Sequence, residues 1–105
     1  MINVLHILSS FEVGGAEMVA LEVLRSLDRE RFSVGVCSLS GPGPMQERFD
    51  AAGVCSHCLE RLPYVRGYDF GLAIRLARLM RYNAIDIVHC HNSHATLYGA
   101  LAARM

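Results

Sequence analysis

Two adjacent glycines, Gly14 and Gly15, stand between an apolar run and an amphipathic segment near the start of the chain. A glycine pair at a helix start lets a ligand approach the backbone closely, because no Cβ is in the way. The pair also presents free N–H groups and the positive end of the helix dipole, which suit an anion such as a phosphate. It therefore predicts an anion site, although glycines at this place can also serve only to make a tight turn.

The known phosphate-binding motifs narrow the choice of anion. A dinucleotide fingerprint needs GxGxxG and an acidic residue after the second strand, whereas that strand here ends at Cys37-Ser38-Leu39-Ser40. NAD is therefore disfavoured. The P-loop sequence GxxxxGK[ST] is absent, and the chain contains no lysine, which excludes a P-loop NTPase. A receiver domain would place an acidic residue after the first strand, where Leu8-Ser9 stands.

Histidines and cysteines form a second group of residues able to do chemistry. His89, His91 and His94 lie close together, and Cys55 and Cys58 flank another histidine. On paper this resembles a zinc ligand set. The cysteines, however, are three apart within an expected strand, so their side chains point to opposite faces of the sheet. We therefore predict no metal, with a structural zinc protein as the minor alternative.

The place of each histidine along its strand predicts its role. His6 lies inside the first expected strand and is predicted to be structural rather than catalytic. His89 is predicted to be a hydrogen-bonded core histidine at a strand end. His91 and His94 follow the end of that strand, where a polar side chain can reach a crevice.

Composition bounds the class of protein. The chain has 105 residues, 52% hydrophobic and 19% charged, which predicts one globular domain with a real core. Ten arginines balance ten acidic residues, and no basic run appears, so we predict no nucleic-acid partner. The sequence has no apolar run of transmembrane length and no signal peptide, so we expect a cytoplasmic protein with reduced cysteines.

Hydrophobic periodicity predicts strands that alternate with helices. The expected strands cover residues 2–8, 32–39, 54–59 and 85–90, and the expected helices cover residues 16–27, 45–52, 70–82 and 94–105. Alternation of this kind predicts an α/β fold with a Rossmann-like, three-layer open parallel sheet. In the first helix the apolar face is assigned to residues 16, 19, 20, 23, 24 and 27, and Glu17 is assigned to the solvent-exposed face. Arg75, Arg78 and Arg81 predict a solvated helix face, although a basic helix can also contact an acidic lipid surface.

The expected sheet brings two polar loops together. Ligands of open parallel sheets bind outside the carboxyl ends of the strands, where the strand order reverses. In the commonest order this reversal lies between the first and fourth strands, which are followed by residues 9–15 and 91–94. We therefore assign substrate binding in this crevice to four side chains: Ser10, Glu12, Asn92 and His94.

Two stretches of the sequence resemble a known family. VLHILSSFEVGGAEMVALEVLRSL and IDIVHCHNSHATLYGALAAR together resemble the N-terminal domain of a GT-B glycosyltransferase of the retaining family 4 type. The resemblance implies a two-domain enzyme that transfers a sugar from a nucleotide-sugar donor to an acceptor hydroxyl, usually without a bound metal. It places Gly14 and Gly15 near the donor diphosphate and His91 near the transferred sugar.

The resemblance also predicts what this chain is by itself. Residues 1–105 correspond to the N-terminal, acceptor-side portion of such an enzyme, without the nucleotide-sugar domain. We expect this portion to be inactive alone and to self-associate, because the edge of its sheet beyond the fourth strand is bare. A peripheral contact with the inner face of the membrane is a further expectation. The alternative is a small flavodoxin-like module that binds a phosphorylated ligand without catalysis.

Overall fold

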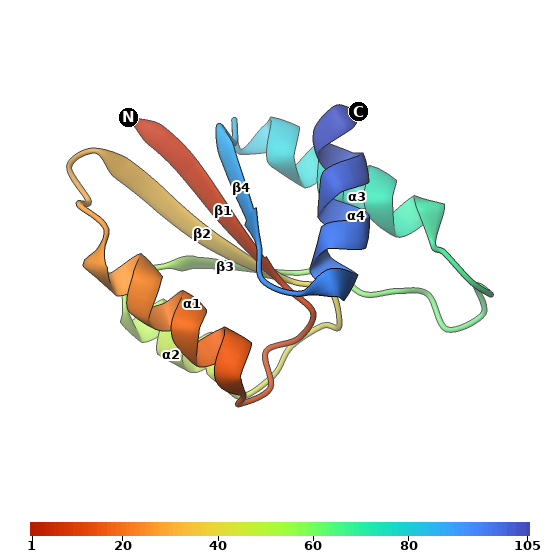
Figure 1. The fold of residues 1–105 in the computed structure, drawn as a ribbon, viewed down its shortest axis with the longest axis horizontal. Helices are drawn as coiled ribbons and strands as arrows, with labels where there is room; N and C mark the ends of the chain where they lie inside the picture. The colour runs from red at the N-terminus through yellow and green to blue at the C-terminus, as the bar shows by residue number, and fades with distance from the viewer.

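The computed structural model describes residues 1–105 and alternates four strands with four helices (Figure 1). The strands are β1 (Ile2–Leu8), β2 (Phe32–Ser38), β3 (Cys55–Cys58) and β4 (Ile87–Cys90). The helices are α1 (Gly15–Ser26), α2 (Met45–Ala51), α3 (Phe70–Tyr82) and α4 (Ser93–Arg104). The predicted order of elements is thus confirmed.

The four strands form one parallel sheet in the order β3-β2-β1-β4. The chain moves outward from β1 to β3 and then crosses back to place β4 on the other side of β1. The strand order therefore reverses between β1 and β4, as predicted. In the register of this pair His6 lies opposite His89.

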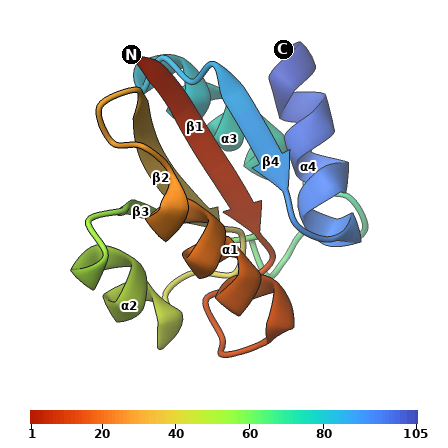
Figure 2. The same ribbon diagram turned by 60° about the vertical axis from the view of Figure 1, so that its left-hand side comes forward.

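Helices cover both faces of the sheet (Figure 2). Side chains alternate between the faces of a strand, so Leu8, Val34 and Val36 pack with α1 and α2. Leu5 and Ile7 point the other way and pack with α3 and α4. The result is two apolar cores separated by the sheet, which is the three-layer architecture that the sequence predicts.

The buried face of α1 differs from the predicted one. Leu21, which was not assigned to it, is buried, whereas Val19 remains 56% exposed. Glu17, which was predicted to lie on the solvent-exposed face, is buried with 8% exposure. The helix is rotated so that residues 17, 20, 21 and 24 face the protein, and burial of the carboxylate is tolerated because the Ser10 hydroxyl donates to it.

Two local interactions change the boundaries of later elements. Strand β4 begins at Ile87 rather than at Ile85, because the Ile85 N–H bonds the Met80 carbonyl and closes the end of α3. Arg75 is not simply solvated, since its guanidinium donates to the Glu60 carbonyl at 2.9 Å and lies 3.6 Å from Asp69. Asp69 caps α3 through a 3.1 Å bond from the Leu72 N–H.

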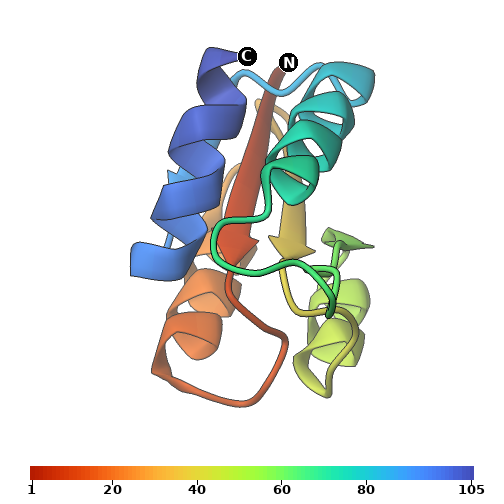
Figure 3. The same cartoon turned by 90° about the vertical axis from the view of Figure 1, so that its right-hand side faces the viewer.

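The chain ends and the loops that follow the strands lie at opposite ends of the sheet. Both chain ends lie together at the amino end of β1, and the loops that follow the strands lie at the opposite end (Figure 3). None of the helices is long and apolar enough to cross a bilayer.

Candidate functional site

The glycine loop between β1 and α1 does not depend on glycine for its backbone conformation. Gly14 is extended, with φ −163°, and the glycines with positive φ are three others: Gly41, Gly53 and Gly67. A Cβ added to Gly15 would meet no protein atom within 4 Å. A left-handed backbone is therefore not the reason for this pair. A Cβ on Gly14 would lie 3.0 Å from Oε2 of Glu17, so Gly14 leaves room for that carboxylate, whereas Gly15 leaves open space beside the backbone.

The N-terminus of α1 has no side-chain cap. Asp69 and Asn92 cap α3 and α4, whereas Gly14 occupies the corresponding position of α1 and offers no side chain. The N–H groups of Gly15, Ala16 and Glu17 consequently make no hydrogen bond within the protein. Three free donors at a helix N-terminus form a site to which an anion can bind.

The loop after β2 packs against the glycine loop and hydrogen-bonds to its backbone. Gly43 lies so close to Phe11 that a Cβ there would be 2.8 Å from the Phe11 carbonyl carbon and oxygen. The Met45 N–H donates to the Phe11 carbonyl at 2.7 Å, and the Ser40 hydroxyl donates to the Ser9 carbonyl at 2.5 Å. The sequence signal for this support is the Gly-Pro-Gly-Pro run at residues 41–44, which indicates a loop but does not specify the segment that the loop contacts.

Asn92 joins the glycine loop to the loop that follows β4. Its Oδ1 accepts from the Ala95 N–H at 2.9 Å, and its Nδ2 donates to the Ser9 hydroxyl at 3.0 Å. The His91 N–H donates to the Ile7 carbonyl at 3.2 Å. The two predicted loops therefore lie side by side across the β1–β4 boundary, and the Asn92 amide is already engaged in holding them together.

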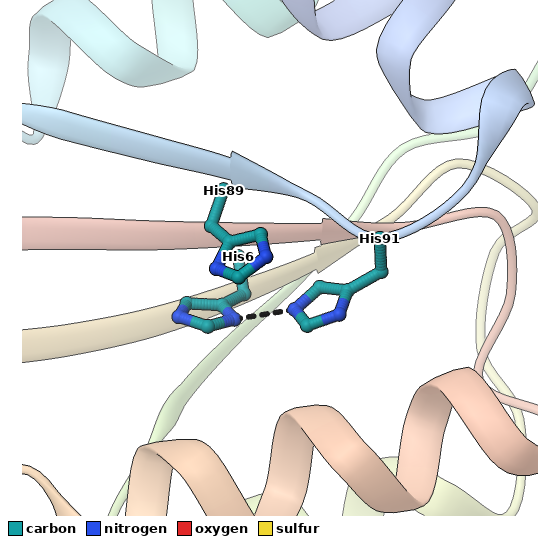
Figure 4. Close-up of side chains that lie close together, drawn as sticks. All are labelled: His6, His89 and His91. Atoms are coloured by element: carbon teal, nitrogen blue, oxygen red, sulfur yellow. Dashed lines mark hydrogen bonds between the residues drawn. The ribbon is translucent and has the colours of Figure 1, made fainter.

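Three histidines form a cluster on the face of the sheet that α1 covers (Figure 4). His6 and His89 project from paired positions of β1 and β4, and His91 follows two residues later. His6 is buried, with 2% exposure, and its Nδ1 lies 2.5 Å from Nε2 of His91. The pairing of His6 with His91 was not foreseen, because it depends on the register between two strands far apart in sequence.

His89 differs from its predicted role. It is exposed and its side chain makes no hydrogen bond, although its ring stacks on that of His91 at a centroid distance of 4.3 Å. Its position on the edge strand explains the exposure, since no element lies beyond β4 in the sheet. The hydrogen-bonded core histidine is His6.

Burial and proximity keep His6 and His91 neutral. Burial, followed by the neighbouring His91 and His89, lowers the pKa of His6 from 6.5 to about 3. Burial and His89 also lower the pKa of His91, while the carboxylate of Glu17 acts in the opposite direction. His6 and His91 are therefore neutral imidazoles at pH 7.

The cluster has the composition of a metal site but not the geometry of one. The nearest nitrogens of the three rings lie within 4.8 Å of one another. A metal must lie about 2.0–2.1 Å from each nitrogen, in the plane of its ring. The planes of His89 and His91 differ by only 7° in a stacked pair, so both lone pairs cannot meet at one ion.

The cysteines do not make up for this geometry, because they lie on opposite faces of β3. The Cys55 thiol is 3.6 Å from His57 Nε2, whereas the Cys58 thiol is 3.6 Å from Oε1 of Gln46 in α2. This is the arrangement predicted from their spacing, and it does not bring the two sulfurs to one ion.

The remaining predicted site residues, Ser10, Glu12 and His94, lie outside the histidine cluster. The Ser10 hydroxyl binds Glu17 and also accepts from the Glu12 N–H, while the Glu12 residue is exposed at the loop surface. His94 is not part of the cluster; its ring lies edge-on to Tyr98, 5.2 Å away, on the face of the sheet that α3 covers.

A hollow of about 410 Å³ lies at the other end of the sheet, and it has the wrong chemistry for a site. It is mostly apolar and is bordered by Met80, Ile85, Val88 and Ala102.

The parallel sheet with helices on both faces defines this molecule as a Rossmann-like α/β domain. Its candidate site lies at the switch point, where the carboxyl ends of β1 and β4 combine free N–H donors with neutral imidazoles.

Comparisons with known proteins identify the family. Residues 13–105 match the model of Glycosyltransferase Family 4, and the chain belongs to this family. It is 32% identical over 92 residues to the capsular polysaccharide biosynthesis glycosyltransferase CapH of Staphylococcus aureus, covering 87% of this chain and 24% of CapH. The chain thus spans about a quarter of this relative.

The fold is shared with a solved structure. Anabaena Alr3699/HepE, crystallised in complex with UDP and glucose, superimposes with a TM-score of 0.77 at 18% identity. The superposition covers 99% of this chain and 27% of the HepE chain. The predicted family and the predicted GT-B-type Rossmann-like fold are both confirmed.

Proposed function

We propose that the protein containing this chain transfers a sugar from a nucleotide-sugar donor to an acceptor hydroxyl, with retention of anomeric configuration. Membership of glycosyltransferase family 4 supports the transferase activity. The observation that carries the proposal is the uncapped glycine loop of α1, which is joined through Ser9 and Asn92 to the loop that bears His91. Free N–H donors thus lie across the switch point from a neutral imidazole.

Each part of the site has a role in this proposal. The N–H groups at Gly15 and just beyond it, made accessible by the Gly14-Gly15 pair, stabilise the negative charge that develops on the departing diphosphate. His91 orients the transferred sugar through a hydrogen bond. Ser10, Glu12 and His94 contribute to substrate binding at the rim, and Asn92 holds the two loops in register.

The remaining features of the whole protein are proposals of the same kind. Residues 1–105 are the N-terminal, acceptor-side portion of the enzyme, and a second domain holds the nucleotide. No metal cofactor takes part, and the 105-residue chain is inactive alone. The protein acts in the cytoplasm, with peripheral contact to the inner face of the membrane.

The test replaces Gly15 in the full protein by alanine, valine and leucine in turn. Because a Cβ at this position meets no protein atom within 4 Å, the fold tolerates the change, whereas a bound diphosphate does not. We expect UDP affinity by calorimetry and turnover of UDP-glucose to fall by about 10-fold or more, increasingly with side-chain size. Ala100→Leu, at an exposed position of α4, is the matched control.

Two outcomes would contradict the proposal. Unchanged turnover in Gly15→Leu would remove the proposed role of the glycine loop. Binding of UDP without sugar transfer, across a panel of UDP-sugars and acceptors, would favour the non-catalytic phosphate-binding module instead.

A further inference from the structure

His6 is the only group that makes a side-chain hydrogen bond with His91. Its Nδ1 faces Nε2 of His91 at 2.5 Å, and the two ring planes differ by 30°. The main chain fixes this approach, because the His91 N–H bonds the Ile7 carbonyl next to His6. With 2% exposure, His6 lies behind His91 and does not itself contact a ligand in the crevice.

The contact between the two rings requires one proton between Nδ1 of His6 and Nε2 of His91. Two neutral imidazoles present either a lone pair or an N–H at each facing nitrogen. Two lone pairs repel each other, and two N–H groups clash, so one ring must donate and the other must accept. The tautomer of His91 is thereby coupled to that of His6: Nε2 of His91 accepts when Nδ1 of His6 carries the proton and donates when it does not, and Nδ1 of His91 takes the complementary state.

We propose that His6 is the positioning residue of His91: it holds the ring in place and fixes its tautomer through a single shared proton. The inference rests on the proposed function, in which His91 bonds the transferred sugar. A sugar hydroxyl can donate or accept, so a fixed tautomer decides which of the two it does. Partners that orient a functional histidine in this way typically contribute about 10- to 100-fold to activity.

The other groups around His91 do not replace His6. His89 from β4 stacks on the ring but makes no hydrogen bond with it. Glu17 from α1 acts on His91 through its charge, while its carboxylate accepts a hydrogen bond from Ser10. His89 is therefore a natural control, because it touches the same ring without sharing a proton with it.

The first experiment reads the tautomer directly. The full protein is labelled with ¹⁵N at histidine only, and the ring nitrogens are followed by NMR between pH 6 and 8. We expect one fixed tautomer for His91 in the unmodified protein. In His6→Phe, which keeps a flat ring but has no nitrogen, we expect averaging between tautomers. In His6→Asn the amide group reaches the place of Nδ1 and restores a single tautomer, and His89→Gln leaves it unchanged.

The second experiment measures transfer. We expect His6→Phe to lower kcat by about 10- to 100-fold with little change in KM for the donor, and His6→Asn to recover most of the loss. A purely structural role would lower the melting temperature of both variants without this recovery. If His6→Phe does not fold, the unmodified protein and His6→Asn still decide the question.

Three results would overturn the proposal. The first is an averaged tautomer of His91 in the unmodified protein. The second is equal kcat in His6→Phe and wild type. The third is stoichiometric binding of Zn²⁺ that shifts the signals of all three rings, since a metal would then replace the shared proton. Failure of the proposed function can be told apart from failure of this proposal. If the protein transfers no sugar, the proposed function fails, whereas the NMR measurement still shows whether His6 fixes the tautomer of His91.

Discussion

Glu17 is the residue whose environment departs most from its expected place on a solvated helix face. Its carboxylate is buried at the N-terminus of α1, where the helix dipole favours negative charge, and Ser10 donates to it. It also acts on His91 across the crevice. A single carboxylate therefore contributes to the field at both halves of the candidate site.

Removing this charge is expected to lower the pKa of His91 further. The negative carboxylate stabilises the imidazolium form, so Glu17→Gln leaves only burial and His89 to act on the ring, and both lower the pKa. Titration of the His91 ring signals by NMR measures the change. Glu12→Gln, at the exposed rim of the same loop, is the control and should leave the titration as it is in wild type. A rise in the pKa would contradict this assignment.

At the scale of elements, the support of the glycine loop by the loop after β2 is the contact most open to test. Gly43→Ala would place a Cβ 2.8 Å from the Phe11 backbone, which is fixed at both ends and cannot move away like a flexible side chain. We expect a loss of about 1–3 kcal/mol of unfolding free energy, measured in urea, together with weaker UDP binding. Gly15→Ala should cost far less, and equal losses in the two variants would refute the argument.

The elements themselves could be predicted because their signals are local. Apolar residues with strand or helix periodicity predict every strand and helix in order. What failed depended on tertiary contacts, such as the bond from Ile85 to Met80 that shortens β4 or the rotation of α1 that buries Glu17. The proximity of the two site loops was predicted from topology, whereas the His6–His91 pair needed the strand register, which no local pattern specifies.

At the scale of the whole molecule, stability should depend on pH through His6. The folded protein holds its pKa at about 3 against 6.5 for the free side chain, so below pH 6.5 the unfolded chain binds a proton that the folded protein does not. The unfolding free energy should therefore fall as the pH drops from 6.5 towards 3. In His6→Asn this slope should be shallower. Urea titrations at several pH values measure it.

The open side of β4 leads to a prediction about assembly of the 105-residue chain. No strand pairs with the outer edge of β4, and Ile87 there is 48% exposed. We expect the chain to self-associate through this edge at high concentration. Ile87→Lys should shift it towards monomer in sedimentation velocity, whereas Tyr82→Lys, exposed elsewhere, should not. A wild-type chain that stays monomeric at high concentration would contradict the prediction.

The position of the chain ends has a practical consequence. The 105-residue chain contains no lysine, so the α-amino group of Met1 is its one primary amine. Met1 is exposed at the end of the sheet opposite the glycine loop and His91 (Figure 3). Amine coupling to a sensor chip would therefore immobilise every molecule in one orientation, with the candidate site facing the flowing solution.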